Sequence, residues 1–280
     1  MGEKPFEVET SDGVTLVGHI GGNGSPALLL HGGPGLTDYT HGCAEELANL
    51  FTTIRYTQRG VAPSGVQGPY TVESHMTDAL AVLDAFQLQK AWVIGHSWGG
   101  HLALHLAVAH PDRILGVVCI DTLGASNEVF DDFRSALTKD LTPEQLARFE
   151  EIEAREEAGE VTEAELVEAY TILWPAYFFD PGKAPEPPPG RGVECSAETF
   201  ASVMEHFEAK TLEEGLPKLR GLTVLFVHGI EDPLPLRASL DTAKLIRGAR
   251  VARVPRCGHL PWIEQPGFTN RALRGLIAQL

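Results

Sequence analysis

The segment at residues 93–100, VIGHSWGG, constrains the fold of this chain more than any other. It ends an apolar, strand-like run with a serine that has glycines on both sides. Residues 95–99 satisfy the G-x-S-x-G pattern, in which a nucleophilic serine occupies a sharp turn between a strand and a helix. Glycines are needed because a Cβ two positions from the serine would strike the neighbouring strand or helix. The segment therefore predicts a strand, a strained turn and a helix, with Ser97 presented as a nucleophile.

A phosphate-binding loop is the main alternative use of such glycines. A nucleotide loop requires a lysine beside Ser or Thr, and a dinucleotide site requires spaced glycines that open a helix. Residues 95–100 offer neither. The glycines at 21–24 have no lysine and lie between two predicted strands, which indicates a turn. The sequence therefore predicts no cofactor.

Most of the chain alternates between strand-like and helical patterns. Two runs, 6–8 and 14–20, flank a Ser-Asp-Gly turn and predict a hairpin that opens a sheet. Apolar residues at helical spacing predict helices over 73–86 and 100–109. Other short apolar or β-branched runs predict buried, largely parallel strands at 27–30, 53–56, 92–94, 116–120, 223–227 and 250–254. This alternation indicates the α/β class, with helices on both faces of the sheet.

The alternation stops between residues 125 and 210, which predicts an inserted helical cap. Within it, 143–159 and 162–173 are helical stretches, and 181–192 is a proline-rich loop. The core domain is accordingly expected to consist of 1–124 and 211–280.

The predicted cap carries most of the negative charge of the chain. Residues 125–210 hold 20 Asp and Glu against 7 Lys and Arg, a net charge of −13 out of −16 for the whole sequence. Solvated helix faces account for this acidity. The alternative is an acidic lid that attracts cationic substrates.

Net charge and composition narrow the possible partners. The formal charge of −16 argues against nucleic acid and anionic membranes, because both are bound largely through Lys and Arg. The longest apolar runs fall far short of the roughly 20 residues of a membrane helix. Residues 1–13 lack the basic end and apolar stretch of a signal peptide. We therefore expect a cytoplasmic protein whose partner is a small molecule or a short peptide; no feature marks an oligomer interface.

The cysteines and one pair of histidines bear on metal binding. The four cysteines are scattered, with no CxxC pair and no zinc spacing, which favours free thiols in a reducing compartment. His101 and His105 have the i, i+4 spacing that can bind zinc on a helix, but HLALH lacks the glutamate of HExxH. Packing near Ser97 is the favoured interpretation, and we expect no metal.

A serine nucleophile needs a base, and the base needs an acid that fixes its tautomer and balances its charge. In folds with this turn, the chain order is Ser, then Asp or Glu, then His. His259, in a loop after the last predicted strand, fits the base. Asp232, after the strand at 223–227, is the preferred acid, with Glu231 and Asp121 as alternatives.

Donors for a tetrahedral oxyanion are predicted on the main chain. The loop HGGPG at 31–35 follows a strand, and its glycines let N–H groups approach a substrate. Gly33 and Trp98 are the expected donors.

These motifs resemble the proline iminopeptidase subgroup of the α/β-hydrolase superfamily. The likeness is carried by HGGPG at 31–35, QRG at 58–60, GHSWGG at 95–100 and the Asp232 and His259 pair. It spans residues 5–124 and 211–280. The resemblance implies an α/β-hydrolase fold that releases an N-terminal residue, typically proline, from short peptides or arylamides without a metal.

The predicted cap departs from that subgroup. There, cap glutamates hold the free amine of the substrate, and one of them directly follows a tryptophan. Here Trp174 is followed by Pro175, so that glutamate is absent, while Glu205 is the candidate for a second one. Thr57 also stands where the subgroup usually has Asp before QRG.

Two classes of function remain open from the sequence. The favoured one is a serine hydrolase that forms an acyl-enzyme with a small amide or ester. Within it, the acidic cap and HGGPG favour an aminopeptidase or amidase, whereas Pro175 favours a carboxylesterase or lactonase. Aromatic residues at Trp174, Tyr177, Phe178 and Phe179 indicate an apolar pocket wall, with packing inside the cap as the alternative. The other class is a ligand-binding receptor on the same fold.

Overall fold

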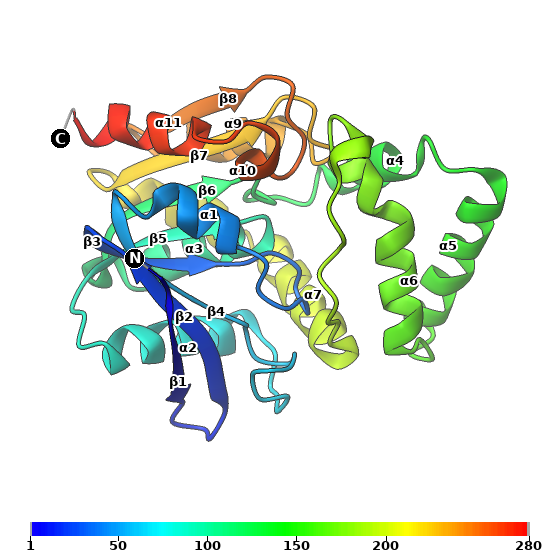
Figure 1. Cartoon of the computed structure of the whole chain (residues 1–280), viewed down its shortest axis with the longest axis horizontal. Coiled ribbons are helices and arrows are strands. Elements are labelled where there is room, and N and C mark those ends of the chain that lie inside the picture. The colour runs from blue at the N-terminus through cyan, green and yellow to red at the C-terminus, as the bar shows by residue number, and fades with distance from the viewer. Residues whose placement is uncertain (1, 279–280) are drawn as a thin grey trace.

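A mixed sheet of eight strands forms the centre of the computed structural model, which describes residues 2–278 (Figure 1). The strand order is β1-β2-β4-β3-β5-β6-β7-β8. The strands are β1 (Lys4–Glu9), β2 (Thr15–Gly22), β3 (Ser25–Leu30), β4 (Phe51–Tyr56), β5 (Ala91–His96), β6 (Ile114–Ile120), β7 (Thr223–Gly229) and β8 (Arg250–Val254). The strands expected from apolar runs are therefore all present.

The direction of the strands places the chemistry at one edge of the sheet. β1 and β2 form the expected antiparallel hairpin, and β2 is antiparallel to β4, whereas all other pairs are parallel. Gly95 in β5 lies in register with Leu30 in β3 and Cys119 in β6. The carboxyl ends of these strands thus meet at one edge, where ligands bind in open α/β sheets. The α/β-hydrolase fold class is confirmed.

Helices cover both faces of this sheet. Two apolar clusters form, one with residues of α2, α3 and α8 and the other with residues of α1, α10 and α11. The core helices are α1 (His41–Leu47), α2 (Val72–Ala85), α3 (Trp98–Ala109), α8 (Thr211–Gly215), α9 (Arg237–Lys244), α10 (Pro261–Glu264) and α11 (Phe268–Ile277). α3 buries ten of its 12 residues, which is why its sequence is apolar almost all round.

Four helices fall within residues 125–210, where the insertion was expected. α5 and α6 stand away from the sheet in Figure 1, and α7 runs back toward it. The four are α4 (Phe130–Thr138), α5 (Pro143–Glu157), α6 (Glu163–Leu173) and α7 (Val193–Glu208). Thr142 with Gln145, and Thr162 with Glu165, form capping boxes that begin α5 and α6. Both predicted helices are present, whereas α4 and α7 were not identified from the sequence.

α7 packs on the core although it falls within residues 125–210. Val203 and Phe207 belong to the apolar cluster that includes α2 and α3. The Ser202 hydroxyl accepts a hydrogen bond from the Val72 N–H at 3.1 Å. By packing, the change from core to cap therefore comes before α7.

The structure also describes the cysteines and the apolarity of the helices. The four cysteines are buried and unpaired. Across residues 2–278, no helix has both the length and the apolarity that a bilayer span requires.

Candidate active site

Ser97 occupies the sharp turn between β5 and α3 that the sequence predicted. Its backbone angles, φ 55° and ψ −120°, are unusual for a residue with a side chain. A Cβ on Gly95 would lie 2.0 Å from the Gly99 carbonyl oxygen. One on Gly99 would lie 2.2 Å from the Leu30 carbonyl oxygen. The glycines are thus required by the close approach of backbone, and the turn holds Ser97 at the cavity described below.

The structure brings Asp232 and His259 together. His259 Nδ1 donates to Asp232 Oδ2 at 2.8 Å, and Asp232 Oδ1 accepts from the Leu234 N–H at 2.8 Å. The alternative acid Glu231 instead accepts from the Cys257 N–H at 3.0 Å. Donation from Nδ1 leaves Nε2 of His259 as the basic nitrogen, as a triad requires.

The protonation state of His259 suits a general base. The side chain is 5% exposed, and this burial lowers the pKa of the imidazole well below its usual value. His259 is consequently neutral at rest and can accept the proton of Ser97.

A buried chain of hydrogen bonds joins the loop at 31–35 to the loop that carries His259. The Gly32 N–H donates to Tyr39 Oη at 3.1 Å, and Tyr39 Oη lies 2.7 Å from His96 Nδ1. His96 Nε2 donates to the His259 carbonyl oxygen at 2.7 Å. Because a carbonyl can only accept, His96 carries its proton on Nε2 and accepts from Tyr39. Sequence reasoning gave His96 no role, since its partners are 57 and 163 residues away.

Gln58 fixes the predicted oxyanion loop against the start of α3. Its side-chain amide donates to the His31 carbonyl oxygen at 2.8 Å and accepts from the Trp98 indole at 2.9 Å. Gly33, with φ 126°, lines the cavity beside Ser97. Trp98 is the first residue of α3, and an N–H in the first turn of a helix has no intrahelical acceptor. Gly33 therefore lines the cavity, and Trp98 directly follows Ser97 at the start of α3, so both remain candidate donors.

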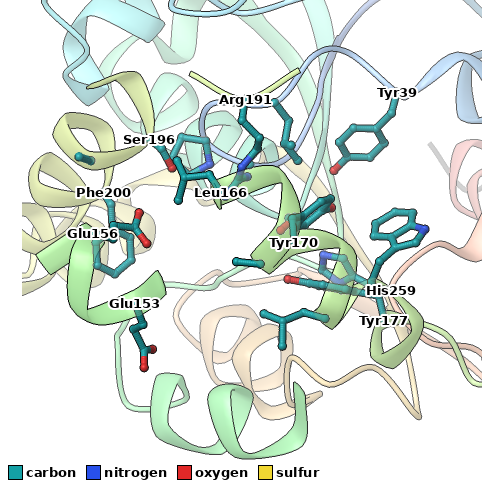
Figure 2. A pocket seen from close by; sticks show the side chains of 18 of the residues that line it. Tyr39, Glu153, Glu156, Leu166, Tyr170, Tyr177, Arg191, Ser196, Phe200 and His259 are labelled. Carbon is teal, nitrogen blue, oxygen red and sulfur yellow. The ribbon is translucent and has the colours of Figure 1, made fainter. Parts of the chain in front are cut away.

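A cavity of about 550 Å³ lies between these core loops and the cap (Figure 2). Ser97 and His259 both line it. Apolar and aromatic residues from the segment 125–210 form a large part of the remaining wall. They are Phe149, Leu166, Ala169, Tyr170, Leu173, Trp174, Tyr177, Ala197 and Phe200.

The predicted substrate-binding residues divide into two groups. Trp174 and Tyr177 line the cavity. Phe178 does not, because it is buried with its ring edge against Trp174. Glu205 does not either: helical periodicity turns Val203 of α7 into the core and Glu205 out to solvent. The structure thus places Phe178 and Glu205 outside the lining of this cavity.

Charged groups in the cavity wall were not found from the sequence. Glu153, Glu156 and Glu157 of α5 line the cavity, and burial raises the pKa of Glu156. Arg191 also lines it, with its guanidinium 5.0 Å from the centre of the Tyr170 ring. No local pattern marks these residues, because the path of the cap over the core decides what faces Ser97.

Arg191 differs from the other arginines of residues 125–210. Arg134, Arg148 and Arg155 each form an ion pair with a glutamate. For Arg191 no ion pair is found within the described chain, and its buried Nε has no hydrogen-bond partner there. Its charge attracts Glu156 and so partly offsets the effect of burial on the pKa of that carboxyl group, but the two groups form no direct ion pair within the described residues. The hydrogen-bond donors of Arg191 are thus left available to a ligand.

The structure accounts for His101 and His105 without a metal. Their Nε2 atoms are 3.1 Å apart, and His101 Nδ1 donates to the Gly124 carbonyl oxygen at 2.7 Å. One imidazole therefore donates to the other. Burial lowers the pKa of His101 to about 4, so the pair is neutral.

Comparison with known proteins places the chain in a family of hydrolases. A family model described as alpha/beta hydrolase fold matches residues 26–266. A 2-hydroxymuconate semialdehyde hydrolase of Pseudomonas putida is 28% identical over 274 residues, which cover 93% of this chain and 90% of the relative. A 2-hydroxy-6-oxo-2,4-heptadienoate hydrolase of Pseudomonas putida is 28% identical over 271 residues, which cover 88% and 87%.

A solved structure supports the fold. A 2-hydroxy-6-oxo-6-phenylhexa-2,4-dienoate hydrolase of Rhodococcus sp. strain RHA1 superposes with a TM-score of 0.70 at 20% identity, covering 99% of this chain and 100% of that one. These relatives are named as hydrolases of dienoate-type compounds and not as proline iminopeptidases. The superfamily prediction is confirmed, while the subgroup stays a prediction.

Proposed function

The chain belongs to the α/β-hydrolase family, and on that premise we propose that it is a serine hydrolase of a small substrate that bears a carboxylate. Ser97 attacks the substrate carbonyl carbon as His259 takes its proton, and Asp232 orients and balances the imidazolium. The Gly33 and Trp98 N–H groups hold the oxyanion. His259 then protonates the leaving group, and water releases the acyl group from Ser97.

The observation that carries the carboxylate is the unpaired Arg191. A guanidinium binds a carboxylate with two parallel hydrogen bonds, and removal from water strengthens that contact. The names of the two Pseudomonas relatives denote substrates with a carboxylate at one end of a conjugated chain and a carbonyl further along it. An apolar wall of aromatic residues suits a flat, conjugated middle. The bond that breaks is then a carbon–carbon bond beside the carbonyl, or an ester bond in a substrate of the same shape.

The glutamates of α5 favour a second candidate, an aminopeptidase or amidase. Glu153, Glu156 and Glu157 face the same cavity and could hold an amine in place of the glutamate that Pro175 removes. Figure 2 draws Glu153 and Glu156 on the side of the cavity away from His259. An N-terminal amine lies one residue from the scissile bond, so this placement supports the carboxylate-bearing substrate more strongly.

Paired rates on matched substrates test the proposal. Wild type, Ser97→Ala and Arg191→Leu are assayed on a 2-hydroxy-6-oxo-dienoate, on the same compound with a neutral carboxamide, and on alanyl and prolyl arylamides. We expect Ser97-dependent loss of the dienoate chromophore. Arg191→Leu should lower kcat/KM for the carboxylate substrate by about 10- to 100-fold, the value of a charged hydrogen-bonded pair, and leave the carboxamide unchanged. Arg148→Leu, which removes an exposed ion-paired arginine, is the matched control.

Other outcomes separate the remaining functions. Arylamide cleavage that disappears when the substrate amine is acetylated would replace this proposal with the aminopeptidase. Turnover of simple aryl esters alone would leave a carboxylesterase or lactonase. If no substrate turned over and Ser97→Ala still bound the dienoate as wild type does, the receptor function would be supported.

A further inference from the structure

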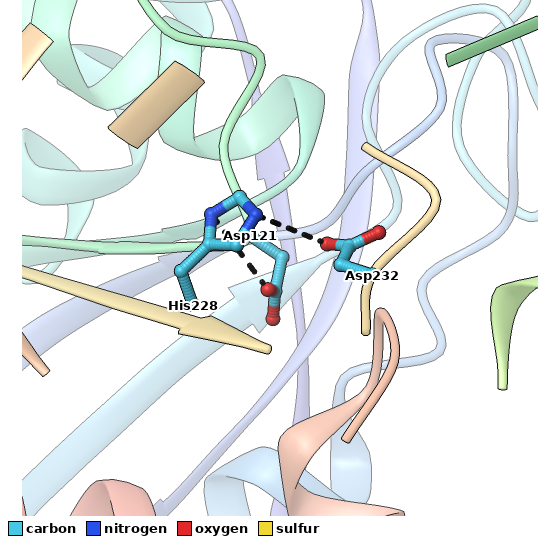
Figure 3. A group of neighbouring side chains, drawn as sticks. All are labelled: Asp121, His228 and Asp232. Carbon is cyan, nitrogen blue, oxygen red and sulfur yellow. Dashed lines mark ion pairs between the residues drawn. The ribbon is translucent and has the colours of Figure 1, made fainter. Parts of the chain in front are cut away.

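A second buried aspartate lies beside the catalytic acid. Asp121 is the first residue after β6, and its side chain is fully buried. Its Oδ1 accepts a hydrogen bond from the Gly229 N–H at 2.7 Å. Within residues 2–278, its Oδ2 has no assigned hydrogen-bond partner. One oxygen of Asp121, one of Asp232 and a ring nitrogen of His228 lie within 4.8 Å of one another (Figure 3).

His228 cannot neutralise the two carboxyl groups. Its Nε2 donates to the Leu234 carbonyl oxygen at 2.9 Å, and its Nδ1 therefore accepts from the Ser239 hydroxyl at 2.8 Å. Burial also lowers the pKa of His228 to about 4. The neutral ring, at 3.7 Å from Asp232 and 3.9 Å from Asp121, supplies neither a charge nor a free lone pair for a metal ion.

The groups around Asp121 leave it without a compensating cation. His228 faces it from β7, and Asp232 faces it from the loop that follows. Cys257 faces it from the loop after β8, and Glu264 from α10. All are acidic or neutral. Burial first, and the charge of Asp232 second, raise the pKa of Asp121 well above its usual value. Two buried carboxyl groups this close cannot both ionise, so one proton remains on the pair.

We propose that Asp121 holds this proton and that its Oδ2–H donates to the Asp232 carboxylate, which makes Asp121 a positioning residue for the catalytic acid. The inference rests on the proposed serine hydrolase function. Asp232 then accepts from three donors: the Leu234 N–H, His259 Nδ1 and Asp121. Asp121 and Asp232 together then present one negative charge to His259. The Oδ2 atom of Asp121, which otherwise has no partner, becomes a hydrogen-bond donor.

The hydrogen bonds of Asp121 also explain why a neutral carboxyl group suits this place. One of its oxygens must accept, from Gly229, and the other must donate, toward Asp232. An asparagine offers the same acceptor and donor at the same size. Asp121→Asn should therefore preserve the arrangement, whereas Asp121→Leu removes both contacts.

The first test measures how fast a fluorophosphonate probe labels Ser97, which requires the triad but not the natural substrate. Asp121→Asn should label within about 3-fold of wild type, and Asp121→Leu about 10- to 100-fold more slowly, since one hydrogen bond to a charged group is lost. Asp232→Asn serves as the reference for loss of the acid: it should label Ser97 about 10⁴-fold more slowly than wild type, because the acid that orients the histidine of such a triad is lost. A loss in Asp121→Asn as large as in Asp232→Asn would overturn the proposal.

The pH dependence of labelling adds a readout that a merely structural role would not move. If Asp121 is neutral, the labelling rates of wild type and Asp121→Asn should fall with the same apparent pKa as the pH is lowered. If Asp121 were ionised, removing its negative charge would lower the pKa of His259, and the labelling rate of Asp121→Asn would fall only at lower pH. Such a shift would contradict the proposal.

Infrared difference spectroscopy decides the question without activity. The spectrum of wild type minus Asp121→Asn at neutral pH should contain the carbonyl band of one protonated carboxylic acid. Its absence, with a carboxylate band in its place, would refute the inference. Failure of wild type to label Ser97 would instead count against the proposed function and leave the spectrum to judge the proton on Asp121.

Discussion

The two walls of the cavity are built in different ways. On the core wall, His96 and Trp98 are at most 1% exposed, and each forms a buried hydrogen bond, His96 to the His259 carbonyl and Trp98 to Gln58. On the cap wall, α5 buries only Ile152 of its 15 residues. The α5–α6 hairpin is joined largely across its surface, where Arg148 pairs with Glu168 at 2.7 Å. The proposed catalytic groups are thus fixed by dense packing, whereas the facing wall is formed in part by an element of lower local stability.

The largest loss of activity is expected from a substitution that disturbs the core wall of the cavity. A Cβ on Gly32 would lie 2.3 Å from Tyr39 Oη and 2.9 Å from Ser97 Cβ. Gly32→Ala should therefore displace the oxyanion loop and lower kcat by about 10²- to 10³-fold, as loss of one oxyanion donor does. The loss should be the same for every substrate that wild type turns over.

A glycine of the cap provides the control for that substitution. A Cβ on Gly182 would meet only Asp180 Oδ1, at 3.3 Å. Gly182→Ala should keep the wild-type kcat. Equal losses in the two variants would show that the walls are not mechanically distinct.

Substitution of aromatic residues should show on which side α7 belongs. Phe207 of α7 is buried in the core cluster, whereas Phe149 of α5 is only partly buried. Phe207→Ala should lower the free energy of unfolding by about 3–5 kcal/mol, the usual cost of a core phenylalanine, and Phe149→Ala by less than half as much. Urea titrations measure both values. Similar losses would place α5 and α7 in one cooperative unit.

Acid should destabilise the core through its buried histidines. Burial lowers the pKa of His75 and His259 to about 3, and of His101 and His228 to about 4. Below the unfolded pKa of about 6.5, the unfolded chain binds protons that the native state excludes, so stability falls as pH falls toward about 4. Each such histidine contributes a slope of about 1.4 kcal/mol per pH unit. Urea midpoints at about pH 7 and pH 5 check the sign; a higher midpoint at pH 5 would contradict it.

The smallest expected effect belongs to the surface of the cap. Arg148 joins α5 to α6 through an exposed ion pair, and such pairs add little to stability in water. Arg148→Met should leave the thermal midpoint of the whole chain unchanged within error. A measurable fall would show that melting of the hairpin is coupled to melting of the core.

Much of the core wall was predictable because its signals are local. Buried parallel strands have sequences of short apolar runs, and the proposed catalytic residues Ser97 and Asp232 follow the ends of such strands. Outside the core wall, the capping boxes at Thr142 and Thr162 are equally local signals, which mark where the cap helices α5 and α6 begin. These features need only neighbouring residues, so a single sequence contains them.

The residues that line the cap wall were less predictable, because the path of the chain decides which side chains face the cavity. Glu205 satisfied a pattern, yet the period of α7 directs it to solvent. Arg191 lies in a proline-rich stretch without a motif, and only the fold of the chain brings it over Tyr170. On the core wall, by contrast, sequence reasoning favoured Asp232 over Asp121, which also follows a strand, and the structure joins Asp232 to His259.

The ion-paired hairpin has a consequence for how this enzyme can acquire new specificities. Its helices bond mainly to each other, and α5 anchors little to the sheet. A hairpin with other charges can therefore replace it as a unit, joined near residues 139–142 and just before Trp174. Beyond that point the chain already supports the core loops, since the Tyr177 carbonyl accepts a hydrogen bond from the His259 N–H at 2.7 Å. Recombination at those two junctions gives a lineage access to new substrates without passing through forms that have lost their nucleophile.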